Sequence, residues 1–262
     1  MTPLKIAAAA TVVLPAADPA TPLRPLLQPL MAEPPRRVSR LIELSLLGAY
    51  RCLKQLRPES RCPLYLALTH GTSGDSIALV KAVTSRGLPT PVAFINQSSN
   101  MAGFYVAASL GIHGSNQAVA ANEFPFEAAL ELAGLRSEHR TQALIGAVEE
   151  CVWPLPEHRA RLGLPPDAAL AESSHWLFVD QNAARPLATV QWVRRYDDEH
   201  AANEALAREH WPAGTVRDEA AAAYSGHAAA ARICRFIENR EGAALLSVRA
   251  SRHGCQAVYV TT

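Results

Sequence analysis

The sequence of 262 residues has neither a long apolar run nor an excess of charge of one sign. No stretch reaches 18 consecutive apolar residues, so no segment is predicted to span a membrane. Lys and Arg number 25 against 24 Asp and Glu, which leaves a formal net charge of +1. A balance this even gives no support to nucleic-acid binding, which usually needs a basic face.

Cysteine is also scarce. The chain has 5 cysteines, an odd number, and no C-x-x-C pair occurs among Cys52, Cys62, Cys151, Cys234 and Cys255. This pattern argues against a disulfide framework and against a zinc site, and it suits a reducing cytoplasm. We therefore predict a cytoplasmic protein without a metal or a cofactor, in which the cysteines are small buried apolar side chains.

The apolar segment near the N-terminus allows two interpretations. Lys5 followed by Ile6–Leu14 is similar to a short signal peptide, but a single lysine is a weak start for one. Pro15 and Asp18 also make a poor cleavage site. We therefore favour a buried strand over Thr11–Leu14 that ends at Pro15.

Apolar residues make up 49% of the chain and charged residues 19%, enough apolar content for a large core. Short apolar runs between turn residues predict strands over Leu64–Leu68, Gln117–Ala121, Leu144–Val148, Trp176–Val179, Leu245–Val248 and Ala257–Val260. Helical patterns predict helices over Val38–Leu56, Ile77–Ser85, Ala102–Leu110 and Phe126–Leu135. Glu199–His210 is predicted to be a polar helix, and the Ala-rich segment Ala220–Ile237 to be helical in its later part. This alternation predicts a layered α/β domain with a mixed sheet, whose last two strands are antiparallel neighbours.

Two further segments have weaker signals. Val92–Ile95 is another short apolar run, and Trp153–Pro166 is rich in proline and arginine and has the composition of a surface excursion.

The most informative position is the turn between the strand Gln117–Ala121 and the following helix. Such a turn exposes a side chain next to the free N–H groups of the helix start, where a nucleophile would be activated and an oxyanion stabilised. The turn holds Asn122 and Glu123, followed by Phe124 and Pro125, and contains neither Cys nor Ser.

The segment 94–135 resembles a β-ketoacyl synthase of the thiolase-like superfamily. Asn100–Gly103 resembles the N-M-A-A-G start of that family's interface helix, and Gly111–Asn116 resembles its L-G-x-x-G-P-N turn. Ala118–Glu123 is similar to the strand that delivers the catalytic cysteine in T-A-C-A-S, with Glu123 at the cysteine position. Chain-length factors, the inactive partners of type II polyketide synthases, have a D-Q pair there, to which Asn122-Glu123 is similar.

Weaker resemblances lie near the C-terminus. Tyr224–Ala230 resembles the K-S-x-x-G-H motif, so that His227 matches one of two active-site histidines while Ala222 replaces the lysine. Ser247–Val260 resembles the family's N-S-F-G-F-G-G hairpin. In the family, the second histidine lies in an H-G-T-G-T motif. In this chain only His70-Gly71-Thr72 is similar to that motif, and it lies in the wrong half of the chain.

Full synthases are well over half as long again, and the missing part falls between about Asp198 and Asp218. The resemblance implies an α/β, layered thiolase-like (αβαβα) fold, shortened in its second half. Residues 1–180 would form the ketosynthase-like N-terminal half and residues 181–262 the shortened C-terminal half. The strand Gln117–Ala121 would be central and would lead into a helix at Phe126.

The resemblance also implies a function. Short chains of this kind are similar to the chain-length-factor-type partners of aryl polyene and xanthomonadin pathways. The chain would be a non-catalytic subunit that pairs with a full-length, active β-ketoacyl synthase in type II fatty acid or polyketide biosynthesis, or else forms a homodimer. Acyl carrier protein would be the other partner, and nucleic acid would not be one.

Several alternatives stay open. A stand-alone malonyl-carrier-protein decarboxylase or acyltransferase would use Glu123 and His227 as catalytic residues. Glu123 is otherwise a first-turn carboxylate that favours the helix dipole, and His227 a helix-start cap. His70 and Asp75 form either an acid–base pair or part of a polar turn.

Overall fold

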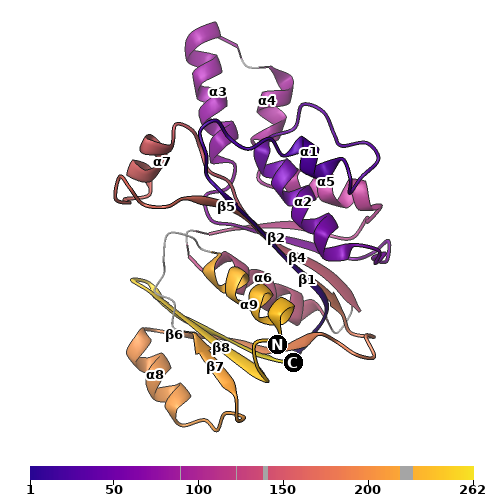
Figure 1. Cartoon of the computed structure of the whole chain (residues 1–262), viewed down its shortest axis with the longest axis vertical. Helices are drawn as coiled ribbons and strands as arrows, with labels where there is room; N and C mark the ends of the chain where they lie inside the picture. Colours follow the sequence, from indigo (N-terminus) through magenta and orange to yellow (C-terminus); the bar gives the residue numbers. More distant parts are fainter. Residues whose placement is uncertain (89, 122, 138–140, 219–226) are drawn as a thin grey trace.

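A computed structural model describes residues 1–88, 90–121, 123–137, 141–218 and 227–262. Its strands join in one sheet with the order β3-β2-β4-β5-β1-β6-β9-β8-β7. The two halves of this sheet meet at a short pairing, in which Leu4–Ile6 of β1 lie opposite 188–190 of β6. The chain therefore builds two sheet halves that face each other (Figure 1).

The first half of the sheet is mixed, because β2 pairs in parallel with β3 and β4 while β5 is antiparallel to β4 and β1. Its strands are β1 (Leu4–Pro15), β2 (Leu64–Leu68), β3 (Asn116–Ala120), β4 (Gln142–Glu149) and β5 (Ala171–Asp180). The second half contains β6 (Ala188–Tyr196), β7 (Thr215–Asp218), β8 (Ala244–Ser251) and β9 (Gly254–Thr261). In it, β8 and β9 form an antiparallel hairpin, as predicted.

Helices cover the sheet in three layers. The helices that the structure describes are α1 (Arg24–Leu27), α2 (Arg40–Leu53), α3 (Ser73–Arg86), α4 (Pro91–Asn96), α5 (Met101–Leu110), α6 (Pro125–Arg136), α7 (Leu155–Arg161), α8 (Glu199–Ala207) and α9 (Ala228–Asn239), of which six form the layers. The helices α1, α2 and α5 pack on the outer face of the first half, and α8 on the outer face of the second. The helices α6 and α9 lie between the halves, which gives the predicted αβαβα order (Figure 1).

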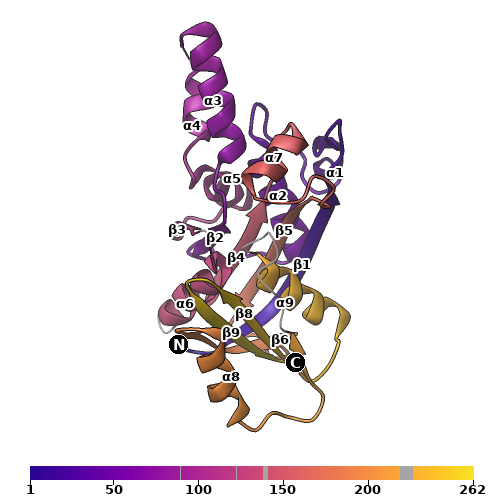
Figure 2. The same cartoon turned by 90° about the vertical axis from the view of Figure 1, so that its left-hand side faces the viewer.

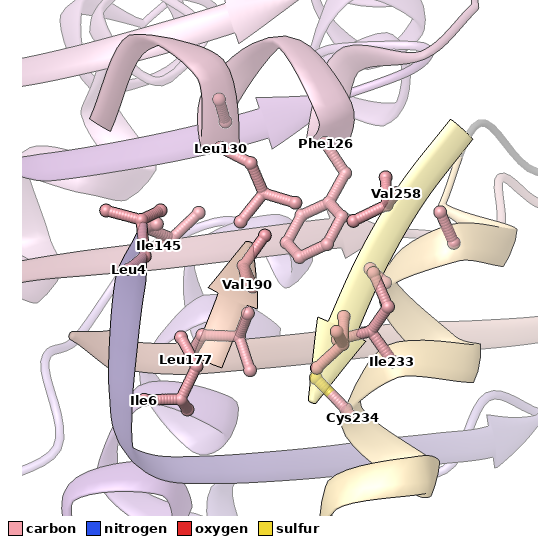
Figure 3. Packing of buried hydrophobic residues seen from close by; sticks show 14 of the residues in the cluster. Leu4, Ile6, Phe126, Leu130, Ile145, Leu177, Val190, Ile233, Cys234 and Val258 are labelled. Carbon is pink, nitrogen blue, oxygen red and sulfur yellow. The ribbon is translucent and has the colours of Figure 1, made fainter. Parts of the chain in front are cut away.

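The central helix layer is apolar because it is covered on both sides. Phe126 and Leu130 of α6 and Ile233 of α9 pack with Leu177 of β5 and Val258 of β9 in one buried cluster (Figure 3). Burial of apolar area contributes roughly 25 cal/mol per Å², so this cluster fixes both helices against both sheet halves.

Glycine permits close packing on the other face of the first half. A Cβ atom at Gly48 would lie 2.4 Å from Trp176 Cδ1, and one at Gly146 would lie 2.6 Å from Trp176 Cη2. Trp176 is fully buried, so both glycines are required for the indole to fit between α2 and β4.

Most predicted elements are present, with corrected bounds. The apolar N-terminal segment is a buried strand, but it covers Leu4–Pro15 rather than Thr11–Leu14 alone. The prediction that Gln117–Ala121 is a central strand was wrong: β3 lies at one edge of the sheet, although it does lead into α6. In this sheet β3 has one neighbouring strand, β2, and its other side is not paired within the described residues.

The two segments with weaker signals contain helices. Val92–Ile95 lies in the helix α4, which begins with Pro91 after a Thr90 cap, rather than in a buried apolar run. The segment Trp153–Pro166 contains the helix α7. Together α3 and α4 project from the end of the molecule as an arm (Figure 2).

Candidate functional site

The turn between β3 and α6 has a strained backbone at Phe124. This residue has φ of 54° and precedes Pro125, the first residue of α6. A bulky residue in the left-handed region is unusual and needs surrounding contacts to hold it. Phe124 is buried, and its ring packs beneath the guanidinium of Arg249 with 5.5 Å from Cζ to the ring centre.

Glu123 is bound to the opposite sheet half. Its Oε2 accepts a hydrogen bond of 2.6 Å from Ser251 Oγ, at the end of β8. The predicted neighbour Asn122 lies outside the described residues. The carboxylate therefore fastens the segment before α6 to β8. Glu123 precedes the Phe124 cap of α6, so it does not occupy the first-turn position that the structural alternative gave it.

A buried ion pair lies in the first turn of α6. Arg249 Nη1 donates to Glu127 Oε1 at 3.3 Å, and both side chains are almost completely buried. Burial raises the pKa of Glu127, while Arg249 acts in the opposite direction. Arg249 and Ser251 are two residues apart on β8, so their side chains face the same side of the strand. One strand therefore supplies both contacts to the helix start.

The cysteines are unsuited to act as thiolate nucleophiles. All five are buried, and none lies at the turn before α6. Burial raises the pKa of Cys62 and Cys151 to about 12 and that of Cys255 to about 11. Burial also raises the pKa of Cys52 and Cys234. Each cysteine is therefore a neutral thiol at pH 7 and a poor nucleophile.

The second predicted residue, His227, lies immediately before α9 and is 1% exposed. Burial lowers its pKa to about 4, so its imidazole is neutral at pH 7. It lines a cavity of about 310 Å³ together with His70, Glu149 and His175. The motif residues Ala222 and Tyr224–Gly226 lie outside the described residues.

Glu149 links two histidines of this cavity. Its Oε1 lies 2.6 Å from His70 Nδ1, and its Oε2 lies 3.9 Å from His227 Nδ1. The hydrogen bond with Glu149 raises the pKa of His70, although burial opposes the shift. With a neutral imidazole, His227 contacts Glu149 without forming an ion pair.

The two alternatives for His70 fare differently. Its hydrogen-bond partner is Glu149 at the end of β4, rather than Asp75 in the first turn of α3, and its carbonyl accepts a turn hydrogen bond from Ser73 Oγ. The structure brings His70 and His227 together, whereas Glu123 is not among the residues that line the cavity. Glu149 was missed, although the parallel strands β2 and β4 bring the residues that follow them to the same edge of the sheet.

The His, Cys, Asp and Glu side chains of the described residues contain no group of three or more suited to hold a metal ion. In the same part of the chain, none of the helices has the length and apolar character needed to cross a bilayer.

No protein-family model matches the sequence, and no curated protein matches it. Solved structures do. The ishigamide ketosynthase/chain length factor is 20% identical with a TM-score of 0.77, covering 99% of this chain and 99% of that one. The AntDE:AntF structure, a type II polyketide acyl-carrier protein in complex with its ketosynthase, is 11% identical with a TM-score of 0.69, covering 100% and 99%.

A third similar structure comes from Xenorhabdus doucetiae and contains the ketosynthase ApeO in complex with its chain length factor ApeC. It is 12% identical with a TM-score of 0.58, covering 99% of this chain and 100% of that one. Identities this low establish the fold and leave the activity open. The chain thus has the thiolase-like fold of ketosynthases and chain length factors.

Proposed function

We propose that this chain is a non-catalytic, chain-length-factor-type subunit that pairs with an active β-ketoacyl synthase. The observation that carries the proposal is the start of α6. The nucleophile position of the resembled family holds Glu123, which is hydrogen-bonded to Ser251, and the next residue is a buried phenylalanine. A condensing enzyme needs an activated thiolate at this point, and the chain has none there.

The open edge of β3 supports pairing with another chain. Ala121 N–H donates to Leu68 O at 3.1 Å, so odd-numbered residues of β3 point their backbone groups toward β2. By alternation, the N–H and C=O groups of Ala118 and Ala120 point to the open edge. An unpaired strand edge is a ready template for a partner strand.

Apolar side chains extend this surface. Phe104 of α5 is 53% exposed and stacks edge-on against Tyr105, whose own side chain packs into the core. Phe94 and Ile95 of the neighbouring α4 are also exposed. Exposed aromatic side chains beside an open strand are typical of an association surface.

The partner classes follow from the resemblance and from the similar structures. Two of those structures combine a ketosynthase with a chain length factor, and the third is an acyl-carrier protein in complex with its ketosynthase. We infer a heterodimer with a full-length synthase, acting on carrier-bound acyl chains in fatty acid or polyketide synthesis of the aryl polyene type. A homodimer through the same edge is the second form.

The stand-alone decarboxylase or acyltransferase lacks a supporting observation. It needs Glu123 and His227 at one substrate, but Glu123 bonds Ser251 and does not line the cavity at His227.

Co-expression with candidate ketosynthases, followed by co-purification and light scattering, tests the proposal. We expect a 1:1 complex with one synthase, and loss of that complex in Ala120→Pro and in Phe104→Arg. Proline removes the edge N–H of an exposed residue without touching the bonds to β2. Ala120→Ser keeps that N–H and is the matched control, which we expect to associate normally.

A wild-type chain that stays monomeric alone and with every candidate synthase would contradict the proposal. So would complexes that form equally well with Ala120→Pro and Ala120→Ser. Circular dichroism of each purified variant establishes that the fold is intact before association is compared.

A further inference from the structure

The helix α3 buries little of its own surface. It projects from the end of the molecule (Figure 2), and no side chain between Ser73 and Ser85 is buried. Val80 and Val83 in its outer part are 60% and 45% exposed. A helix with so little burial has low local stability, so the contacts at its first turn determine whether it stays in place.

Glu150, the residue after β4, supplies one of these contacts. Its Oε1 accepts a hydrogen bond of 2.9 Å from the Gly74 N–H in the first turn of α3. Thr72, the N-cap residue, makes no side-chain hydrogen bond to the helix start, so Glu150 acts in its place. A Cβ atom on Gly74 would lie 2.7 Å from the same oxygen, so only glycine lets the backbone cover the carboxyl group this closely.

The Glu150 carboxyl group is enclosed, and no cation is paired with it in the described part of the chain. The residue is 5% exposed and lines two cavities of about 310 and 250 Å³. Two neighbouring basic groups already have carboxylate partners, because Arg40 binds Glu172 and His70 binds Glu149. Ionisation of Glu150 would therefore place an unpaired charge in the interior.

The charged groups around Glu150 disfavour its ionised form. Asp75 of α3, Glu149 of β4 and Glu172 of β5 are the carboxyl groups that repel it. The other ionisable groups that line its two cavities are Arg40, His70, Lys81, Cys151, His158, His175, His227 and Arg235. Of these, Lys81 and Arg235 are exposed, so solvent screens their attraction for a charged Glu150.

We propose that Glu150 is a proton-dependent latch for α3, whose neutral carboxyl group holds Gly74 and the first turn of the helix and whose ionised form releases them. Thr72 Oγ1 donates a hydrogen bond of 2.6 Å to Gln97 O, immediately after α4, so the latch also acts on the second helix of the arm. The latch lies within this chain, so its test does not depend on a partner synthase.

The direction of the pH effect follows from the surroundings of the carboxyl group. Burial raises the pKa of Glu150 to about 8, the three neighbouring carboxyl groups add to the shift, and the Gly74 N–H opposes it. When α3 is released, water reaches the group and its pKa returns toward the ordinary value of 4.5. Between these two values the released state binds fewer protons than the closed state, so release becomes more favourable as the pH rises.

Amide hydrogen exchange of the full chain between pH 5.5 and pH 7.5 tests the latch. Exchange rates divided by those of unstructured peptides give the equilibrium constant for opening of the first turn of α3. For the wild type we expect this constant to rise about tenfold per pH unit. Glu150→Gln keeps an oxygen acceptor for the Gly74 N–H but cannot ionise, so its opening constant should stay nearly independent of pH. The matched control Glu157→Gln, at an exposed position of α7, should follow the wild type.

A second variant tests the contact itself. Gly74→Ala places a Cβ atom against Glu150 Oε1 and should raise the opening constant at every pH. Parallel pH profiles of the wild type and Glu150→Gln would overturn the latch, as would a Gly74→Ala chain whose first turn is as protected as that of the wild type. The amides of β5 report global unfolding, and an equally large pH dependence there would overturn a release confined to α3.

Discussion

The helices α6 and α9 lie in the same layer between the same two sheet halves, yet their N-terminal ends differ in chemistry. The start of α6 is closed by Phe124 and by contacts from Arg249 and Ser251 of β8. The start of α9 opens on a cavity, which His227 lines together with the His70–Glu149 pair. The free N–H groups of a helix start can support chemistry only where a reactant can reach them.

This difference shows that the position of a family motif in the fold does not by itself show that the chemistry of that motif takes place there. The family resemblance places the nucleophile position at α6, where the side chains are already engaged with one another. The titratable groups that line a cavity lie instead near the start of α9. The closed state of the first end supports the proposed partner role, because that end holds the nucleophile position of a condensing enzyme.

The largest expected effect concerns the closed end. Glu127→Ala removes the carboxylate that faces Arg249 in the interior, and we expect the free energy of unfolding to fall by about 3 kcal/mol or more. Urea denaturation measures it. The matched control is Glu209→Ala, which breaks the partly exposed pair with Arg194 and should cost about 1 kcal/mol or less. Equal losses in the two variants would contradict a structural role for the buried pair.

At the start of α9, the buried His227 should make the stability of the protein depend on pH. The pKa of His227 is about 4 in the folded chain against 6.5 as its ordinary value, because the ring is buried. Between these values the unfolded chain binds a proton that the folded chain does not, so stability falls as the pH decreases. His227→Gln removes this contribution. The wild type should lose about 1.4 kcal/mol per pH unit relative to the variant between pH 6 and pH 4.

Urea denaturation of both proteins at several pH values measures this difference. Glu150 and the other carboxyl groups with raised pKa values remain in both proteins, so their contributions cancel in the comparison. Curves that run parallel from pH 7 to pH 4 would mean that His227 is charged or accessible in the folded chain.

The elements that the sequence predicted well are those with strong local signals. Leu64–Leu68 is a strand with the predicted bounds because the run is apolar on both faces and follows Pro63. The helix Met101–Leu110 ends at Gly111, whose φ of 67° suits glycine. The strand β6 was missed because its outer part carries Arg194 and Arg195, and its pairing with β9 comes from tertiary contacts.

The candidate site was predictable only in part for a related reason. The sequence singled out His70 and His227 separately, but their proximity depends on the packing of α9 against the first sheet half. The role of Glu149 depends on the parallel pairing of β2 with β4, which no local pattern specifies. His175 carried no signal at all, because a histidine within an apolar strand is indistinguishable from a core residue.

The smallest expected effect is on catalysis at Glu123. Glu123→Cys places a thiol at the start of α6, removes the hydrogen bond to Ser251 and should cost about 1 kcal/mol of stability. We expect no gain of condensation, because a reactive thiolate needs a nearby base or cation, and His227 is a neutral ring in a cavity that residue 123 does not line. Mass spectrometry after incubation with acyl- and malonyl-carrier protein should detect no acyl adduct on either the wild type or the variant. A stable adduct on the wild type, or carbon dioxide release by the chain alone that disappears in Glu123→Ala, would make the closed end catalytic and reverse the contrast between the two helices.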